Sequence, residues 1–171
     1  MKVGILSDSH YKSDYTKEVI NLLKENQAEY LIHAGDLCKE ENLKHLEKSG
    51  LTYVCVFGNN DFSLIELSSK YNIKQEPYYF KIKDISFKLM HLPFYLTGDT
   101  DIVIYGHTHI FETDYKNGTL FLNPGEVCAR EKPFVECILL DINENEYIIH
   151  YYSKDINENK FLKEEIKYER K

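Results

Sequence analysis

Residues 2–10 read Lys2-Val3-Gly4-Ile5-Leu6-Ser7-Asp8-Ser9-His10, a short apolar run that ends in polar side chains. Two further apolar runs end in the same way, at Tyr30–His33 and at Thr52–Phe57. Apolar residues at helical spacing fill the intervals, at 14–26 and at 39–49. This strand–helix–strand–helix–strand order predicts a parallel sheet with helical crossovers.

The rest of the chain is mostly β-rich. A short helix is expected at about 62–70, and strand-like segments follow at 78–82, 85–91, 102–105, 111–115, 119–122, 134–141 and 146–152. Asn117-Gly118 is typical of a hairpin turn, because both residues tolerate a positive φ. Residues 160–171 are charge-rich and are expected to form either a final edge strand or a frayed tail. The sequence therefore predicts one α/β domain over residues 1–171, in which two mixed β-sheets pack face to face with flanking helices.

The composition is ordinary for a globular protein, with 43% hydrophobic residues, 29% charged residues and a net charge of −7. Its basic residues are scattered, which argues against a groove for a nucleic-acid polymer. The apolar stretches are too short for a membrane span or a signal peptide. The 4 cysteines lack a C-x-x-C pairing and are expected to be reduced thiols. We therefore expect a cytoplasmic protein that does not enter a membrane, with a homo-oligomer as one option.

Metal-binding side chains follow the ends of the apolar runs, at Asp8, His10, Asp36, Asn59, His91, His107 and His109. Because the loops at strand ends meet on one edge of a sheet, these side chains are expected to lie close together. In Gly106-His107-Thr108-His109, the two imidazoles can bind one metal ion, or one ion each of a close pair. Any single piece also fits an ordinary turn or a core histidine. Carboxylate, imidazole and amide donors without thiolate suit Mn²⁺, Fe or Zn²⁺ better than a structural zinc site.

The order of these blocks resembles the calcineurin-like metallophosphoesterases. The matching blocks are Asp8-x-His10, Gly35-Asp36, Gly58-Asn59-x-Asp61, His91 and Gly106-His107-Thr108-His109. Asn123-Pro124-Gly125 is similar to the motif of the small bacterial and archaeal phosphodiesterases of the YfcE/MJ0936 type. The resemblance spans residues 3 to 126. It implies a metal-dependent phosphodiesterase that hydrolyses a small phosphodiester or nucleotide.

The resemblance also implies a role for each ligand. One divalent ion would be held by Asp8, His10 and His109, the second by Asn59, His91 and His107, and Asp36 would bridge the two. Mn²⁺ is the first choice of metal, with Fe, Zn²⁺ and Ni²⁺ as alternatives. A hydroxide between the ions would attack phosphorus. Asp36, Asn59 and His91 would thus act catalytically through the metals, and Asn59 would also contact the substrate.

Three features depart from the family pattern. Asn60 stands where many members of the wider superfamily have a histidine that protonates the leaving group, and an amide cannot supply that proton. The stretch between His91 and Gly106 is short, which predicts a structured loop and a more open cleft. Glu126 replaces the serine that is usual after Asn-Pro-Gly, so a hydroxyl contact to phosphate at that point is in doubt.

Residues around the ligand set also have expected roles. Asp61 is predicted to be the carboxylate that orients a ligand imidazole. Arg130 is either a clamp for a phosphate oxygen or a solvated surface residue, and we include it as a candidate substrate contact. His33 is expected to be a partly buried histidine that supports the end of its strand.

Two alternative functions stay open. The first is a phosphomonoesterase on the same metal centre. The second is a non-catalytic interaction scaffold like the retromer subunit Vps29, which shares the fold of this family but has lost metal-site side chains. Retention of every ligand position argues against a scaffold, whereas an exposed apolar patch at Phe94, Tyr95 and Leu96 would favour it.

Overall fold

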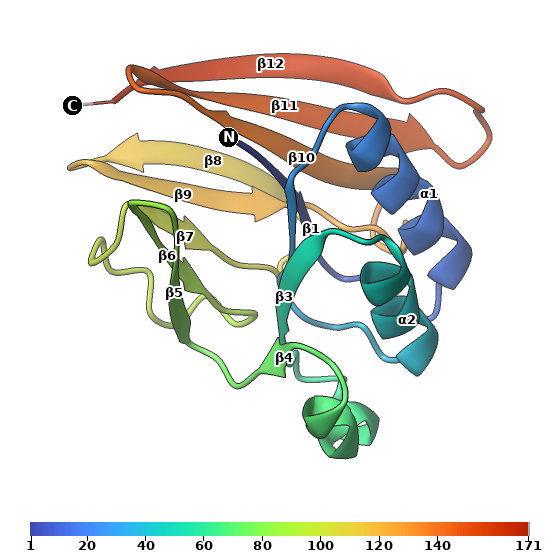
Figure 1. Ribbon diagram of the computed structural model, residues 1–171. Helices are drawn as coiled ribbons and strands as arrows, with labels where there is room; N and C mark the ends of the chain where they lie inside the picture. Colours follow the sequence, from blue (N-terminus) through green and yellow to red (C-terminus); the bar gives the residue numbers. More distant parts are fainter. Residues whose placement is uncertain (171) are drawn as a thin grey trace.

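The computed structural model describes residues 1–170, which form two facing β-sheets with helices outside the larger sheet (Figure 1). The larger sheet has the order β12 (Leu162–Glu169), β11 (Glu146–Asp155), β10 (Phe134–Ile142), β1 (Lys2–Leu6), β2 (Tyr30–His33), β3 (Thr52–Val56) and β4 (Ile73–Lys74). The smaller sheet has the order β5 (Tyr78–Ile82), β6 (Ile85–Leu89), β7 (Ile102–Ile104), β9 (Thr119–Pro124) and β8 (Phe111–Lys116). The helices are α1 (Ser13–Glu25), α2 (Glu40–Lys48) and the 3₁₀ helix η1 (Phe62–Ser69).

Both sheets are mixed, as the sequence predicts. Strands β1, β2, β3 and β4 are parallel to one another, whereas β10, β11 and β12 pair antiparallel with their neighbours. In the smaller sheet β6, β7 and β9 are parallel, with β5 and β8 antiparallel at its edges. The α/β class with two mixed sheets packed face to face is therefore confirmed.

Alternation along the strands builds two core layers. In β1, Val3 and Ile5 belong to the core between the two sheets, whereas Leu6 belongs to the core under the helices. Gly4 lies on the helix side, where an added Cβ would stand 2.8 Å from Leu31 and 2.9 Å from Leu23. The absence of a side chain at Gly4 therefore lets α1 pack directly on the sheet.

The structure differs from the sequence expectations in small elements. Strand β4 has only 2 residues and was not predicted. Most of the charge-rich segment 160–171 is an edge strand, since β12 pairs with β11 along its length. Its Ile166 and Tyr168 pack against the core, while Lys171 lies outside the described residues. No helix within residues 1–170 combines the length and the apolar character that crossing a membrane requires.

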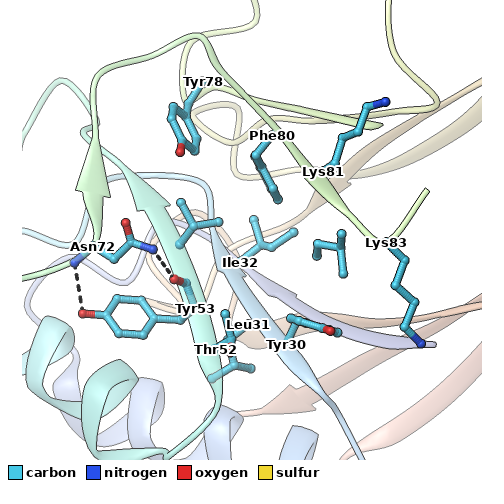
Figure 2. A pocket seen from close by; sticks show the side chains of 12 residues that line it. Tyr30, Leu31, Ile32, Thr52, Tyr53, Asn72, Tyr78, Phe80, Lys81 and Lys83 are labelled. Atoms are coloured by element: carbon cyan, nitrogen blue, oxygen red, sulfur yellow. Dashed lines mark hydrogen bonds between the residues drawn. The ribbon is translucent and has the colours of Figure 1, made fainter. Parts of the chain in front are cut away.

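A hollow of about 270 Å³ lies between the sheets at the amino ends of β2 and β3. Tyrosine, phenylalanine and lysine side chains line it, including Tyr30, Tyr53 and Phe80 (Figure 2). The Tyr53 hydroxyl accepts a hydrogen bond of 3.2 Å from the amide of Asn72. This hollow is at the opposite end of the parallel strands from the predicted ligands, which follow the carboxyl ends.

Candidate metal centre

The predicted ligands occupy loops with unusual backbone conformations. Positive φ values occur at Asp8 (53°), His10 (45°), Asp36 (58°), His107 (69°) and His109 (60°). Such values are uncommon for residues other than glycine and persist only where the surroundings impose them. Here the amide of Asp8 donates to the carbonyl of Gly35 at 3.1 Å, and the amide of His10 donates to that of Asp36 at 2.8 Å. The loops after β1 and β2 therefore hold each other in place.

A first set of ligand atoms gathers around His10. Its Nε2 lies 3.4 Å from Nε2 of His109, 3.6 Å from Oδ2 of Asp36 and 4.0 Å from Oδ1 of Asp8. Nε2 of His109 in turn lies 3.2 Å from Oδ1 of Asp8. The exposed fractions of Asp8, His10 and His109 are 0%, 6% and 4%. Four donor atoms thus converge on side chains that are almost fully buried.

A second set gathers around the side-chain oxygen of Asn59. That oxygen lies 2.9 Å from Nε2 of His91 and 3.0 Å from Nδ1 of His107. His91 is fully buried, whereas Asn59 and His107 are exposed. The second set therefore opens toward solvent.

Asp36 lies between the two sets. Its Oδ2 is 3.6 Å from Nε2 of His10 and 3.5 Å from Nε2 of His91. Asn60 holds this carboxylate, because its backbone amide donates to Oδ1 at 2.8 Å and its side-chain amide donates to Oδ2 at 2.6 Å. Asn60 therefore fixes the carboxylate that lies between the two sets.

The donor set fits divalent metal ions. Donors that share one ion at about 2.0–2.2 Å stand about 3–4 Å from one another, which is the spacing of the atoms here. Oδ1 of Asp8 is fully buried, makes no hydrogen bond of standard geometry within residues 1–170, and lies 3.2 Å from Nε2 of His109. A buried carboxylate oxygen is costly unless a cation meets it, and either a protonated His109 or a metal ion bound by its Nε2 would supply that charge. No residue larger than glycine fits beside the Asp36 carboxylate, because a Cβ at Gly58 would lie 2.2 Å from Oδ1 of Asp36.

The imidazoles are oriented by other parts of the chain. Nδ1 of His109 lies 2.5 Å from Oε2 of Glu126, Nδ1 of His91 donates to the carbonyl of Ala34 at 2.8 Å, and Nδ1 of His10 lies 3.4 Å from the sulfur of Cys38. These contacts turn the Nε2 atoms toward the ligand clusters.

The expectation that Asp61 orients an imidazole is corrected by the structure. Asp61 accepts hydrogen bonds from the amides of Cys38 at 2.6 Å and Gly58 at 2.8 Å. It therefore ties together the loops that carry Asp36 and Asn59. The carboxylate that lies beside a candidate ligand imidazole is Glu126. The sequence signal that could have indicated it is the glutamate at a position where serine is usual after Asn-Pro-Gly.

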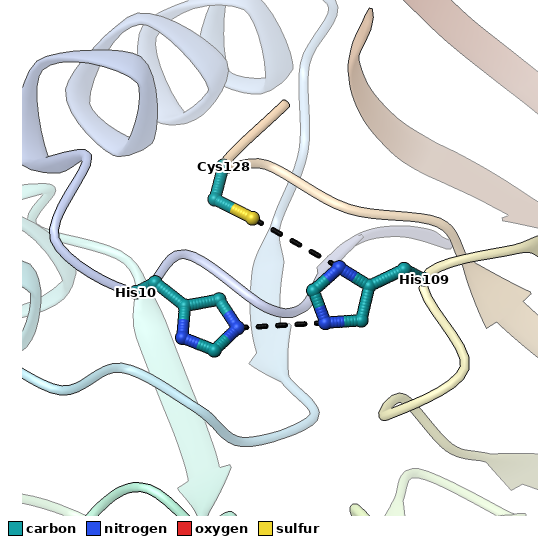
Figure 3. Close-up of side chains that lie close together, drawn as sticks. All are labelled: His10, His109 and Cys128. Atoms are coloured by element: carbon teal, nitrogen blue, oxygen red, sulfur yellow. Dashed lines mark hydrogen bonds between the residues drawn. The ribbon is translucent and has the colours of Figure 1, made fainter. Parts of the chain in front are cut away.

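A thiol also lies near the first set. His10 and His109 face each other through their Nε2 atoms, and Cys128 approaches Nδ1 of His109 at 3.9 Å (Figure 3). The Cys128 thiol donates to Oε2 of Glu126 at 3.2 Å. Its sulfur is therefore on the side of the ring that faces Glu126. All 4 cysteines are free, as the sequence predicts, and all are buried.

Electrostatics distinguish the two imidazoles of the first set. Burial lowers the pKa of His10, which favours the neutral form that binds metals. Burial also acts to lower the pKa of His109, but its contacts with Asp8, Cys128 and Glu126 outweigh this effect and raise the pKa to about 11. A metal ion that binds at His109 must therefore displace a proton.

Arg130 and His33 occupy different positions around the centre. Nη2 of Arg130 lies 3.1 Å from Nε2 of His109, and the residue lines a groove of about 430 Å³ together with His107 and His109. His33 is fully buried, lies 2.8 Å from the hydroxyl of Ser9, and has its pKa lowered by burial to about 3. Arg130 thus points into the centre, and His33 supports the strand ends behind it.

The short segment after His91 is a loop, as expected. Lys88, fully buried, holds it by donating to the carbonyl of Thr97 at 2.8 Å and pairing with Asp99 at 2.5 Å. The loop displays an apolar patch in which Phe94, Tyr95 and Leu96 are 75%, 60% and 42% exposed.

Comparisons with known proteins agree on one family. Residues 1–145 match the calcineurin-like phosphoesterase superfamily domain. The chain is 29% identical to the phosphodiesterase MJ0936 of Methanocaldococcus jannaschii over 160 residues, which cover 86% of this chain and 96% of that protein. The structure of an archaeal phosphodiesterase superposes with a TM-score of 0.75 at 28% identity, covering 86% of this chain and 97% of that one. A Vps29 variant from Entamoeba histolytica has the same fold, with a TM-score of 0.77 at 24% identity over 98% and 99% of the two chains.

Proposed function

The chain belongs to the calcineurin-like phosphoesterase superfamily, and from this premise we propose that it is a metal-dependent phosphodiesterase acting on a small phosphodiester or nucleotide. The observation that carries the proposal is the position of Asp36, whose Oδ2 lies within 3.6 Å of one imidazole from each ligand set. A single oxygen so placed can serve two cations. In this proposal residues 1–171 act as one domain.

In the proposed site the ligands would divide between two divalent ions. Asp8, His10 and His109 would hold one ion, Asn59, His91 and His107 would hold the other, and Asp36 would serve both. Mn²⁺ is the metal that we propose first for both positions. When bound, the two ions supply Lewis acidity toward the phosphate oxygens and lower the pKa of water so that hydroxide is available at neutral pH.

The chain's own residues position the substrate and the centre. Arg130 lines the groove beside His107 and His109, where its guanidinium can donate to a phosphate oxygen. Asn60 keeps the Asp36 carboxylate in place through two hydrogen bonds. Because an amide cannot protonate a departing alkoxide, the site favours esters with good leaving groups.

The test uses the full chain, stripped with a chelator and reloaded with Mn²⁺, Fe²⁺, Zn²⁺ or Ni²⁺. Bis(p-nitrophenyl) phosphate and p-nitrophenyl phosphate report diesterase and monoesterase activity. Asp36→Asn keeps the size of the side chain but removes its charge, and we expect a loss of about 1000-fold in diesterase activity. His91→Ala should also abolish metal stimulation. Asp84→Asn, an exposed position in the β5–β6 turn, is the matched control.

Two outcomes would redirect the proposal. A higher kcat/KM on the monoester than on the diester would make the protein a phosphomonoesterase. Reloaded wild-type protein no more active than Asp36→Asn would favour the scaffold function, which has support from the exposed patch at Phe94, Tyr95 and Leu96. Metal-stimulated diesterase activity that is present and equal in wild type, Asp36→Asn and His91→Ala would instead contradict the two-metal mechanism.

A further inference from the structure

Glu126 follows the Asn123-Pro124-Gly125 turn and is fully buried. A buried carboxylate requires hydrogen-bond donors on both oxygens. Oε2 lies 2.5 Å from Nδ1 of His109 and accepts the Cys128 thiol at 3.2 Å. Oε1 accepts the backbone amides of Glu131 at 2.9 Å and Lys132 at 2.8 Å. The two oxygens therefore contact two different parts of the site.

The contact through Oε2 prepares His109 as a ligand. When Nδ1 donates to a carboxylate, the metal-binding lone pair is placed on Nε2 and the ring becomes a stronger donor. Nε2 of His109 faces the first ligand set, 3.2 Å from Oδ1 of Asp8 and 3.4 Å from Nε2 of His10.

The contact through Oε1 fixes the loop that carries Arg130. The amides of Glu131 and Lys132 immediately follow Arg130 in the chain, and Nη2 of Arg130 lies 3.1 Å from Nε2 of His109. Anchoring these amides limits where the guanidinium can reach. The same carboxylate therefore sets the position of a ligand imidazole and of a candidate phosphate contact.

The backbone of Glu126 is held in place by contacts with Glu136. Its backbone amide donates to Oε2 of Glu136 at 3.1 Å, and Lys132 donates to the same oxygen at 2.6 Å. A Cβ at Gly125 would lie 2.3 Å from that oxygen, so the backbone of the turn packs directly on the Glu136 side chain and leaves no space for a larger residue at position 125. The carboxylate thus has a rigid base and ties the loop to the sheet.

We propose that Glu126 is a positioning residue that couples the first metal-ligand set to the Arg130 loop, so that metal binding and phosphate binding reinforce each other. The inference rests on the proposed function, because it takes Asp8, His10 and His109 as ligands of a metal ion. It adds a connection between that ion and the substrate loop through one side chain.

Glu126→Gln tests the connection with little change in volume. The amide has one oxygen, so it can accept from His109 or from the loop amides, and its NH₂ group then opposes the other partner. We expect chelator-competition titration to show about 10- to 100-fold weaker binding of one Mn²⁺ and unchanged binding of the other. In metal-saturated protein, the affinity for inorganic phosphate should fall about tenfold in the same variant. Glu164→Gln, exposed on β12, is the matched control.

Arg130→Ala completes a double-mutant cycle. Alone it should weaken phosphate binding and leave Mn²⁺ binding in the absence of phosphate unchanged. In the combined variant the loss of phosphate affinity should be smaller than the product of the two separate losses, because both substitutions remove the same ordered contact. In wild-type protein, phosphate should tighten the affected Mn²⁺ site, and Arg130→Ala should reduce this effect.

The outcomes separate this inference from the proposed function. Wild-type protein without metal-stimulated diesterase activity would overturn the proposed function. Active wild-type protein whose folded Glu126→Gln variant binds both Mn²⁺ ions and phosphate with wild-type affinity would overturn only the coupling. If Glu126→Gln does not fold, the wild-type measurement decides, and phosphate that leaves Mn²⁺ affinity unchanged overturns the coupling.

Discussion

The two ligand sets differ in burial and in charge. The first set contains a carboxylate of its own, Asp8, and its members are at most 6% exposed. The second set consists of an amide and two imidazoles, of which Asn59 and His107 are exposed. A buried anionic site holds a cation more strongly than an open neutral one, because water screens the attraction less. In the proposed two-metal centre, we therefore expect a tight first site and a weaker, exchangeable second site.

The groups that contact Nδ1 of the imidazoles also differ between the two sets, and the difference again favours tighter metal binding by the first. His109 is backed by the carboxylate of Glu126, whereas His91 is backed by the neutral carbonyl of Ala34. A charged partner increases the donor strength of an imidazole more than a neutral one does. The orientation of the imidazole and the nearby charge therefore both favour stronger metal binding by the first set.

Removing one imidazole from each set should give the largest difference between the two proposed sites. We expect His10→Ala to lower diesterase activity by about 100-fold even in excess Mn²⁺. His107→Ala should lose similar activity at limiting Mn²⁺ but recover to within about tenfold of wild type in excess Mn²⁺. The second site is open to solvent and keeps its other ligands, so a higher Mn²⁺ concentration can fill it despite the lower affinity. His45→Ala, on α2, is the control. Equal rescue of both variants by metal would show that the sites are equivalent.

The pH dependence of metal affinity should sharpen the difference. Metal-free His109 has a pKa raised to about 11, so at neutral pH it holds a proton that the metal displaces. Affinity at the first site should therefore rise by about tenfold per unit between about pH 6 and about pH 8. Calorimetry in two buffers of different ionisation enthalpy measures the proton released. Binding at the first site without proton release would contradict the assignment of His109.

Asn60→His tests the carboxylate that joins the two sets. The variant keeps the backbone donor to Oδ1 of Asp36 but exchanges the side-chain donor for a group that can protonate a leaving alkoxide. The ratio of activity on an alkyl diester to activity on bis(p-nitrophenyl) phosphate should rise by about tenfold. An unchanged ratio would mean that protonation of the leaving group does not limit the reaction.

The clustering of the candidate ligand residues could be predicted because each follows a local pattern, an apolar run that ends in a loop. The two-sheet fold followed from the same runs and from the Asn117-Gly118 hairpin, where both residues have positive φ. Strand β4 escaped prediction because 2 residues carry no period that a sequence can show. In β12, Ile166 and Tyr168 alternate with polar residues, which is a faint strand pattern within a charged segment.

The partners of the ligands could not be predicted in the same way. Glu126 meets His109 only because the β8–β9 hairpin returns the chain to its starting point, and 17 positions separate the two residues. Asp61 is next to the Gly58-Asn59 turn, yet its side chain accepts hydrogen bonds from the backbone amides of Cys38 and Gly58 rather than from an imidazole. Such pairings depend on how loops pack, which the local pattern does not contain.

The most direct test of the two-site account is a titration of the chelator-stripped full chain with Mn²⁺, with bound metal and diesterase activity followed in parallel. We expect two bound ions of unequal affinity, with activity that appears only as the second, weaker site fills. Full activity at one ion per chain, or binding of two ions without activity, would contradict it.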